Sequence, residues 1–223
     1  MTFRVRSFIV LLAAAGLLLG VGGASVDATL LPTGGSLFPV PAEPDPTGGA
    51  VMPPTGMTVP FASGGFSGTL TSTVTAGDPS NALGGLTFTY LLTNDAVSSN
   101  AISRVTVDSF TGFMTDVSYQ TPAPGGSVLP SLVDRSTADV VGFSFLPTAV
   151  SGAFGVLSPG TSSSLLVVQT DATTFASTSA FVIDGATVNV SSFAPIPEPG
   201  SFCLAALGVI CLMAYACRRR SMA

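Results

Sequence analysis

Short segments in which apolar and polar residues alternate run through the middle of the chain. In residues 86–93 this alternation places four apolar side chains on one face: Leu86, Phe88, Tyr90 and Leu92. In residues 102–110 it sets Val105 and Val107 opposite Arg104. A period of two over this length is typical of a β-strand with one buried face. The pattern therefore predicts half-buried strands.

About eight such strands are predicted, separated by turn signals at intervals of roughly 10 to 20 residues. Residues 164–170 are apolar on both faces, which favours a central strand. Asp184 and Gly185 lie between two apolar runs and are typical of a two-residue hairpin turn. The other candidate strands are residues 66–75, 86–93, 102–110, 113–119 and 139–145. Because no helical pattern separates them, we predict an all-β fold, an antiparallel β-sandwich.

The β-sandwich is expected to occupy residues 61–195, with a core built from the inward faces of its strands. The predicted core residues are Phe88, Tyr90, Val105, Val107, Phe143, Phe145, Val167, Phe181 and Ile183. Residues 29–60 are rich in Pro and Gly, which excludes a continuous helix or central strand and predicts a linker. Two alternatives for this linker are docking of Leu37, Phe38 and Val40 on the domain, and use as a Pro-rich ligand.

The first 24 residues have the parts of a secretory signal peptide. Arg4 and Arg6 precede an apolar run, and small residues follow it, so cleavage is expected after Ala24 or Ala28. An uncleaved N-terminal membrane anchor is the alternative. In either case we expect the segment to form an N-terminal signal helix and the middle of the chain to be exported.

A second apolar segment, residues 201–217, contains no formal charge. Its 17 residues would form a helix about 26 Å long, slightly shorter than the roughly 30 Å hydrocarbon core of a bilayer. We therefore predict a single C-terminal transmembrane helix. The three residues that follow it, Arg218, Arg219 and Arg220, are expected on the cytoplasmic side by the positive-inside rule.

The tripeptide Pro197, Glu198 and Pro199 stands directly before this predicted helix. The order of tripeptide, short apolar helix and Arg cluster, over residues 196–220, resembles the PEP-CTERM protein-sorting signal. An ordinary stop-transfer anchor is the alternative. The resemblance implies a bacterial envelope protein that is recognised by an exosortase, a membrane-embedded cysteine transpeptidase. It also implies that the tail is removed near the tripeptide and that the mature protein is released or transferred to another surface component.

Charge and cysteine content narrow the possible functions of the exported part. The whole chain has seven Arg, no Lys and no His. Between Ser25 and Pro199 there are twelve acidic residues and two Arg, which gives this segment a net charge of −10. A nucleic-acid partner is therefore not expected, and the usual His-dependent catalytic and zinc sites are excluded. All three cysteines, Cys203, Cys211 and Cys217, lie in or at the end of the predicted helix, so no disulfide is expected in the domain.

The acidic residues of the domain are scattered and form no recognised motif. We expect Arg104 and Arg135 to pair with nearby aspartates, and most acids to be solvated turn or strand-face residues. Calcium binding at Asn94 and Asp95, or at Asp134 and Asp139, is the alternative. No catalytic residue, cofactor site or metal site is assigned.

The sequence thus predicts an exported cell-surface or extracellular-matrix protein without evident catalytic activity. Its expected location is the bacterial envelope, first as a single-pass precursor with the ectodomain outside and then at the cell surface or secreted. Expected partners are a signal peptidase, an exosortase and the membrane, with exopolysaccharide as a candidate. The alternative functions are a carbohydrate-binding module, which would need exposed aromatics such as Tyr90 or Tyr119, and a secreted hydrolase, which would need paired carboxylates.

Overall fold

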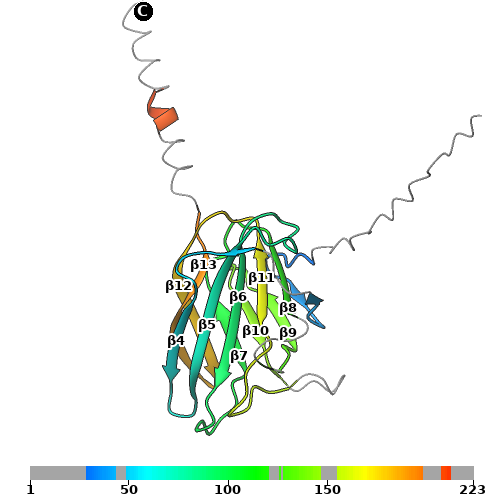
Figure 1. Ribbon diagram of the computed structural model, residues 1–223, viewed down its shortest axis with the longest axis vertical. Helices are drawn as coiled ribbons and strands as arrows, with labels where there is room; N and C mark the ends of the chain where they lie inside the picture. Colours follow the sequence, from blue (N-terminus) through cyan, green and yellow to red (C-terminus); the bar gives the residue numbers. More distant parts are fainter. Residues whose placement is uncertain are drawn as a thin grey trace, which may run out of the picture.

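The computed structural model describes residues 29–43, 49–120, 126, 128–146, 155–197 and 207–211. Within these residues the protein is almost entirely β-structure, and its two sheets pack against one another (Figure 1). All strand pairs are antiparallel except the short pair β2 and β8. The predicted all-β, antiparallel fold is confirmed.

One sheet, called sheet I here, has six strands in the order β1-β9-β10-β7-β12-β13. Its strands are β1 (Ser36–Leu37), β7 (Arg104–Val107), β9 (Leu132–Arg135), β10 (Val141–Ser144), β12 (Phe175–Asp184) and β13 (Ala186–Pro195).

The other sheet, called sheet II here, has the order β2-β8-β11-β6-β5-β3, and β4 pairs with β5 beside this path. Its strands are β2 (Ala42–Glu43), β3 (Ala50–Val51), β4 (Met57–Ala62), β5 (Ser67–Ala76), β6 (Thr87–Asn94), β8 (Thr115–Gln120) and β11 (Leu166–Thr170). All five residues of β11 are buried, as its apolar sequence predicted for a central strand.

The core lies between the two sheets and draws side chains from both. Seven of the nine predicted core residues are buried, and six of them belong to the core cluster: Phe88, Tyr90, Val105, Val107, Phe143 and Phe145. Val167 is also buried, but on the other face of β11 from the core residues Leu166 and Val168. The Tyr90 hydroxyl on β6 donates a hydrogen bond of 2.8 Å to the Phe193 carbonyl on β13, which links sheet II to sheet I. Burial raises the pKa of Tyr90 well above its ordinary value, so the phenol stays protonated and keeps this bond.

The longest pairing of the structure is the hairpin of β12 and β13. It extends from the pair Phe175 and Pro195 to the pair Asp184 and Ala186, so Gly185 alone lies between the last paired residues. Gly185 has a φ of 66°, a left-handed conformation that glycine adopts without steric cost. The hairpin predicted at Asp184-Gly185 is therefore present, with a tighter turn than expected.

The inward face of β12 is the opposite of the predicted one. Ala180 and Val182 are fully buried, whereas Phe181 and Ile183 are only partly buried. The pairing with β7 decides this, because Val182 stands opposite the buried Val105 and Ile183 stands opposite the outward-facing Arg104. Phe181 and Ile183 are thus not core residues, although they are larger than the residues that replace them.

The segment expected to be a linker, residues 29–60, contributes strands to both sheets. β1 joins sheet I beside β9, while β2 and β3 belong to sheet II. β4, which begins in this segment at Met57, also belongs to sheet II. Leu31 and Val40 are 1% and 4% exposed, so the segment also fills part of the core. Of the residues considered for docking, Val40 is buried, Leu37 packs against the core and Phe38 is half exposed.

A matched pair of substitutions on β12 tests this orientation. Val182→Ala removes two methyl groups from the core and should lower the free energy of unfolding by about 2 kcal/mol. Ile183→Ala removes more carbon atoms from a partly exposed face and should cost less than about 1 kcal/mol. Urea unfolding of both variants measures the difference, and a larger loss for Ile183→Ala would contradict the observed register.

Candidate functional site

The chain leaves the sandwich directly at the end of β13. Pro195, the last residue of β13, is buried, and Ile196 is held by two hydrogen bonds to Thr174. The Ile196 amide donates to the Thr174 carbonyl at 3.2 Å, and the Thr174 hydroxyl donates to the Ile196 carbonyl at 2.8 Å. We call this pair of residues the exit clamp. It fixes the point where the folded domain ends.

Aromatic packing supports the exit clamp from inside. Phe175 directly follows Thr174, and Phe193 precedes Ile196 by three residues on the paired strand. Their rings meet edge to face with centroids 5.4 Å apart. Beyond the clamp, Pro197 is exposed. The first residue of the predicted sorting tripeptide therefore stands at the surface of the domain.

The remaining residues of the predicted sorting segment fall largely outside the described residues. These are Glu198 and Pro199 of the tripeptide, the topology residues Arg218, Arg219 and Arg220, and two cysteines, Cys203 and Cys217. A helical turn is described at residues 207–211, where Leu207, Val209 and Ile210 are exposed and Cys211 is a free thiol. Among the described residues no helix has the length and apolar character needed to cross a bilayer. The signal peptide, residues 1–24, and both proposed cleavage points are likewise outside the described residues.

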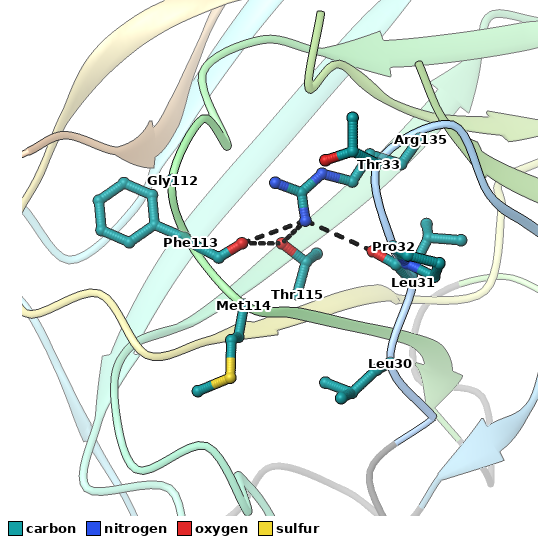
Figure 2. Close-up of a pocket in the computed structure, with 9 residues that line it drawn as sticks. All are labelled: Leu30, Leu31, Pro32, Thr33, Gly112, Phe113, Met114, Thr115 and Arg135. Carbon is teal, nitrogen blue, oxygen red and sulfur yellow. Dashed lines mark hydrogen bonds between the residues drawn. The ribbon is translucent and has the colours of Figure 1, made fainter. Parts of the chain in front are cut away.

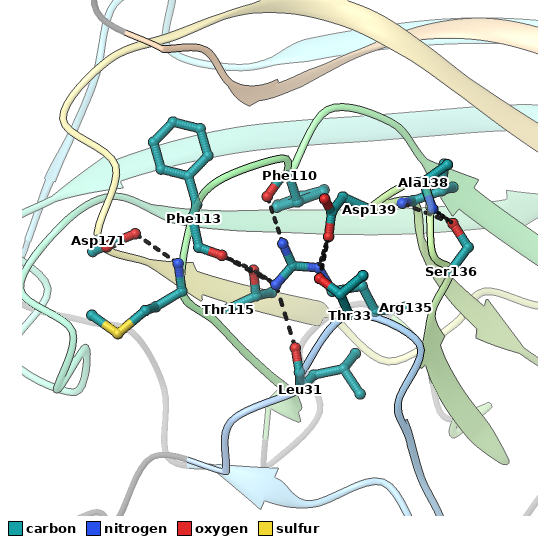
Figure 3. Close-up of polar contacts among 12 residues, drawn as sticks. Leu31, Thr33, Phe110, Phe113, Thr115, Arg135, Ser136, Ala138, Asp139 and Asp171 are labelled. Atoms are coloured by element: carbon teal, nitrogen blue, oxygen red, sulfur yellow. Dashed lines mark hydrogen bonds and ion pairs between the residues drawn. The ribbon is translucent and has the colours of Figure 1, made fainter.

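Arg135 at the end of β9 is a buried cation that joins three separate segments. Its guanidinium donates to the carbonyls of Phe110 at 2.7 Å, Phe113 at 3.1 Å and Leu31 at 3.4 Å. Its Nε pairs with the Asp139 carboxylate at 2.8 Å (Figure 3). Arg135 therefore ties the N-terminal segment and the loop after β7 to sheet I.

A pocket of about 300 Å³ opens beside Arg135 (Figure 2). It is lined by Leu30, Leu31, Pro32, Thr33, Gly112, Phe113, Met114, Thr115 and Arg135. Leu30 and Met114 are half exposed at its wall, and Arg135 is its single charged lining residue. The N–H groups of Arg135 already donate hydrogen bonds to carbonyls of the protein. The pocket therefore offers a ligand mainly apolar contacts.

The second domain cation, Arg104, lies on the outer face of sheet I. It forms a bidentate ion pair with Asp134 at 2.6 and 2.7 Å, and both side chains are 27% exposed. Gly142 on the intervening strand β10 makes this pair possible, because a Cβ there would collide with the guanidinium. Both predicted Arg–Asp pairings, of Arg104 and of Arg135, are thus confirmed.

The acids considered for calcium binding have other partners. Asp134 and Asp139 are paired with Arg104 and Arg135, and Asp95 accepts a hydrogen bond from Ser67 at 2.8 Å. No group of three or more His, Cys, Asp or Glu gathers at a common point in the described part of the chain.

The aromatic residues considered for sugar binding are mostly internal. Tyr90 is fully buried and bonded to Phe193, and Tyr119 is partly buried against the core. Among the described residues Phe38 is the one aromatic side chain that is at least half exposed. Within that part of the chain, sheet faces carry no exposed aromatic row.

Comparison with known proteins identifies the segment that follows the exit clamp. The family described as the PEP-CTERM protein-sorting motif matches residues 195–220. The chain carries a PEP-CTERM sorting motif. This match starts at Pro195, the last residue of β13, so the motif adjoins the folded domain without an intervening linker. A PEP-CTERM motif marks an exported envelope or cell-surface protein that an exosortase processes.

The PEP-CTERM match concerns the tail alone. Neither the curated proteins nor the solved structures contain a significant match to the chain. The sandwich itself is therefore interpreted from its own residues. Sequence reasoning located the PEP-CTERM tripeptide, but it missed Thr174, because a hydroxyl that bonds a distant carbonyl leaves no local pattern.

Arg135 can be tested against Arg104 as a matched control. Arg135→Met leaves Asp139 and three carbonyl groups without their buried partner, so it should lower the free energy of unfolding by about 3–5 kcal/mol. Arg104→Met breaks a pair in contact with solvent and should cost no more than about 1 kcal/mol. Chemical denaturation of both variants gives the comparison, and equal losses would show that Arg135 does not hold these segments together.

Proposed function

We propose that the chain is a non-enzymatic surface or matrix protein whose β-sandwich is presented for exosortase processing by the PEP-CTERM tail, residues 196–220. The main support is the match to the PEP-CTERM motif at residues 195–220, which begins where β13 ends. The described strands thus end at the residue where the match begins. Removal of the tail near the tripeptide would leave every strand in place.

The order of the tail residues supports a membrane-bound precursor. The uncharged run 201–217 would span the bilayer, and Arg218, Arg219 and Arg220 would anchor its cytoplasmic end. Together with a signal peptide over residues 1–24, removed by a signal peptidase after Ala24 or Ala28, this gives a precursor with the sandwich outside. After processing, the domain would be secreted or attached to the cell surface, where exopolysaccharide is a candidate partner.

The chemistry of the tripeptide suits recognition in an extended form. Each proline fixes its own φ near −65° and disfavours a helical conformation in the residue before it, so Pro197 and Pro199 keep the segment extended. Glu198 adds one negative charge between them. An enzyme in the outer part of the bilayer could therefore bind the motif as an extended strand.

A non-enzymatic role for the sandwich is supported by what its polar groups already do. The chain has no His, and both domain Arg residues are engaged in ion pairs with aspartates. The pocket beside Arg135 has no carboxylate in its lining and so lacks the acid–base pair that a glycoside hydrolase requires.

Replacement of the tripeptide tests the proposed recognition. A triple substitution to Ala at Pro197, Glu198 and Pro199 should abolish tail removal in an exosortase-containing host, because it removes the extended conformation and the single charge. A matched control exists in Pro44-Asp45-Pro46, a second Pro-acid-Pro sequence, whose change to Ala should leave processing unchanged. Mass spectrometry of the exported protein reads the C-terminus in each case. Tail removal that continues in the triple variant would refute recognition through the tripeptide.

The exit clamp provides a second test, because it restrains the residue before the motif. Thr174→Val removes the 2.8 Å bond to the Ile196 carbonyl while keeping the shape of the side chain. The lost hydrogen bond should cost about 0.5–1.5 kcal/mol of local stability. The state in which Ile196 is detached from Thr174 should then be populated roughly 2- to 10-fold more, and processing should speed up by no more than that factor.

Thr161→Val is the control, since its hydroxyl makes a similar bond of 2.7 Å to the Ser158 carbonyl, away from the exit. Pulse-chase labelling in the native host measures both rates. An unchanged rate in Thr174→Val, or an equal change in both variants, would show that the clamp does not limit access to the motif.

A further inference from the structure

Three polar residues lie side by side on the outer face of sheet II. In the strand register Gln169 of β11 stands opposite Thr87 of β6 on one side and opposite Asp116 of β8 on the other. The adjoining Val117 and Val168 belong to the core, so the row faces away from the core. All three side chains are nevertheless buried, with exposures of 0 to 1%. Such burial requires a partner for each polar atom.

Hydrogen bonds fix the orientation of the Gln169 amide. The Ser80 hydroxyl donates its one proton to Asp78 at 2.7 Å, and Thr87 donates to the other oxygen of Asp78 at 2.6 Å. Ser80 must therefore accept at its oxygen, which it does from Gln169 Nε2 at 2.9 Å. With Nε2 directed to Ser80 on the β6 side, Gln169 Oε1 occupies the other edge of the amide, toward Asp116 and β8.

The carboxylate of Asp116 stands opposite Gln169, so its oxygens face the amide oxygen of Gln169. Neither carboxylate oxygen of Asp116 makes a well-formed hydrogen bond, and neither does Gln169 Oε1 or the buried Ser118 Oγ two residues along β8. Burial raises the pKa of Asp116 to about 6, although backbone N–H groups of Val117 and Thr29 lower it in part. The Asp116 carboxylate and the Gln169 amide oxygen thus face one another across adjacent strands, where side chains on opposed residues lie about 5 Å apart at Cβ. The Ser118 hydroxyl, which can donate as well as accept, lies two residues along β8.

These oxygens need a hydrogen-bond donor or a cation between them, and no cationic side chain of the described structure supplies one. The whole chain lacks Lys and His, while Arg104 and Arg135 are committed to Asp134 and Asp139. A proton on Asp116 or a cation from solution remains, and the arrangement of carboxylate, amide and hydroxyl oxygens suits a hard metal ion.

We propose that Asp116 and Gln169 form a calcium-binding site on the outer face of sheet II, with the Ser118 hydroxyl beside it. Calcium accepts carboxylate and amide oxygens in flexible geometry and commonly retains water among its six to eight ligands. A site with one carboxylate binds weakly, and dissociation constants of about 10⁻⁴ to 10⁻³ M are ordinary for extracellular calcium modules. The ion joins β8 to β11 and thereby stabilises the middle of sheet II.

The test uses the full chain, purified in detergent and treated with a chelator, at constant ionic strength. Added Ca²⁺ should raise the midpoint of thermal unfolding by about 3–6 °C at a tenfold excess over the dissociation constant. Asp116→Asn should lose this shift, whereas Asp184→Asn, in the β12–β13 turn where Asn is well tolerated, should keep it. Gln169→Met, which removes the amide oxygen, should weaken calcium binding measured by equilibrium dialysis.

Several results would overturn the proposal. One is a wild-type midpoint that Ca²⁺ does not change, and another is a shift that persists in Asp116→Asn. A midpoint that rises as the pH falls from 7 to 5 and is insensitive to Ca²⁺ would show that a proton occupies Asp116 instead. If Asp116→Asn fails to fold, dialysis of the wild type and Gln169→Met against Ca²⁺ decides the question, and equal binding by the two contradicts the site.

Discussion

The ten-residue pairing of β12 with β13 is the constraint on which both the core and the chain exit depend. It carries Phe193 to the position where its carbonyl accepts the Tyr90 hydroxyl, so the two sheets are joined at the edge of sheet I. It also brings Thr174 opposite Ile196, where two hydrogen bonds end the fold. A chain that shifted this pairing by one residue would turn Val182 outward and displace the start of the PEP-CTERM motif at the same time.

Scarcity of positive charge shapes the rest of the molecule. With two Arg in an exported segment of net charge −10, each cation serves more than one purpose. Arg135 neutralises Asp139 and also caps carbonyls from separate segments, while Arg104 pairs with Asp134 across Gly142. Among the described residues no cation pairs with Asp116, and the proposed calcium ion would take that place. The acidity that makes a nucleic-acid partner unexpected would also favour the binding of metal ions.

The parts of the fold that follow from sequence are those governed by local alternation. The strand around Tyr90, the central strand β11 and the turn at Gly185 each carry a clear pattern, and each is present. The face of β12 could not be predicted, because Ala180 and Val182 compete with Phe181 and Ile183 as apolar sets and only the pairing with β7 decides between them. In residues 29–60 the prolines correctly exclude long elements, yet strands of two residues fit between them. The motif Pro197-Glu198-Pro199 was visible as a linear pattern, whereas the clamp and the row through Gln169 depend on contacts between distant residues.

The short exit determines how the protein would stand on a surface. Because Ile196 is hydrogen-bonded to Thr174 and the motif match starts at Pro195, few residues would separate the folded domain from an end processed near the tripeptide. The Gly185 turn of the β12–β13 hairpin would then lie about 30 Å from the attachment point, because each strand residue adds roughly 3.3 Å. Neighbouring copies would present the same end outward. The length of the hairpin would then largely set the height of a layer of such copies.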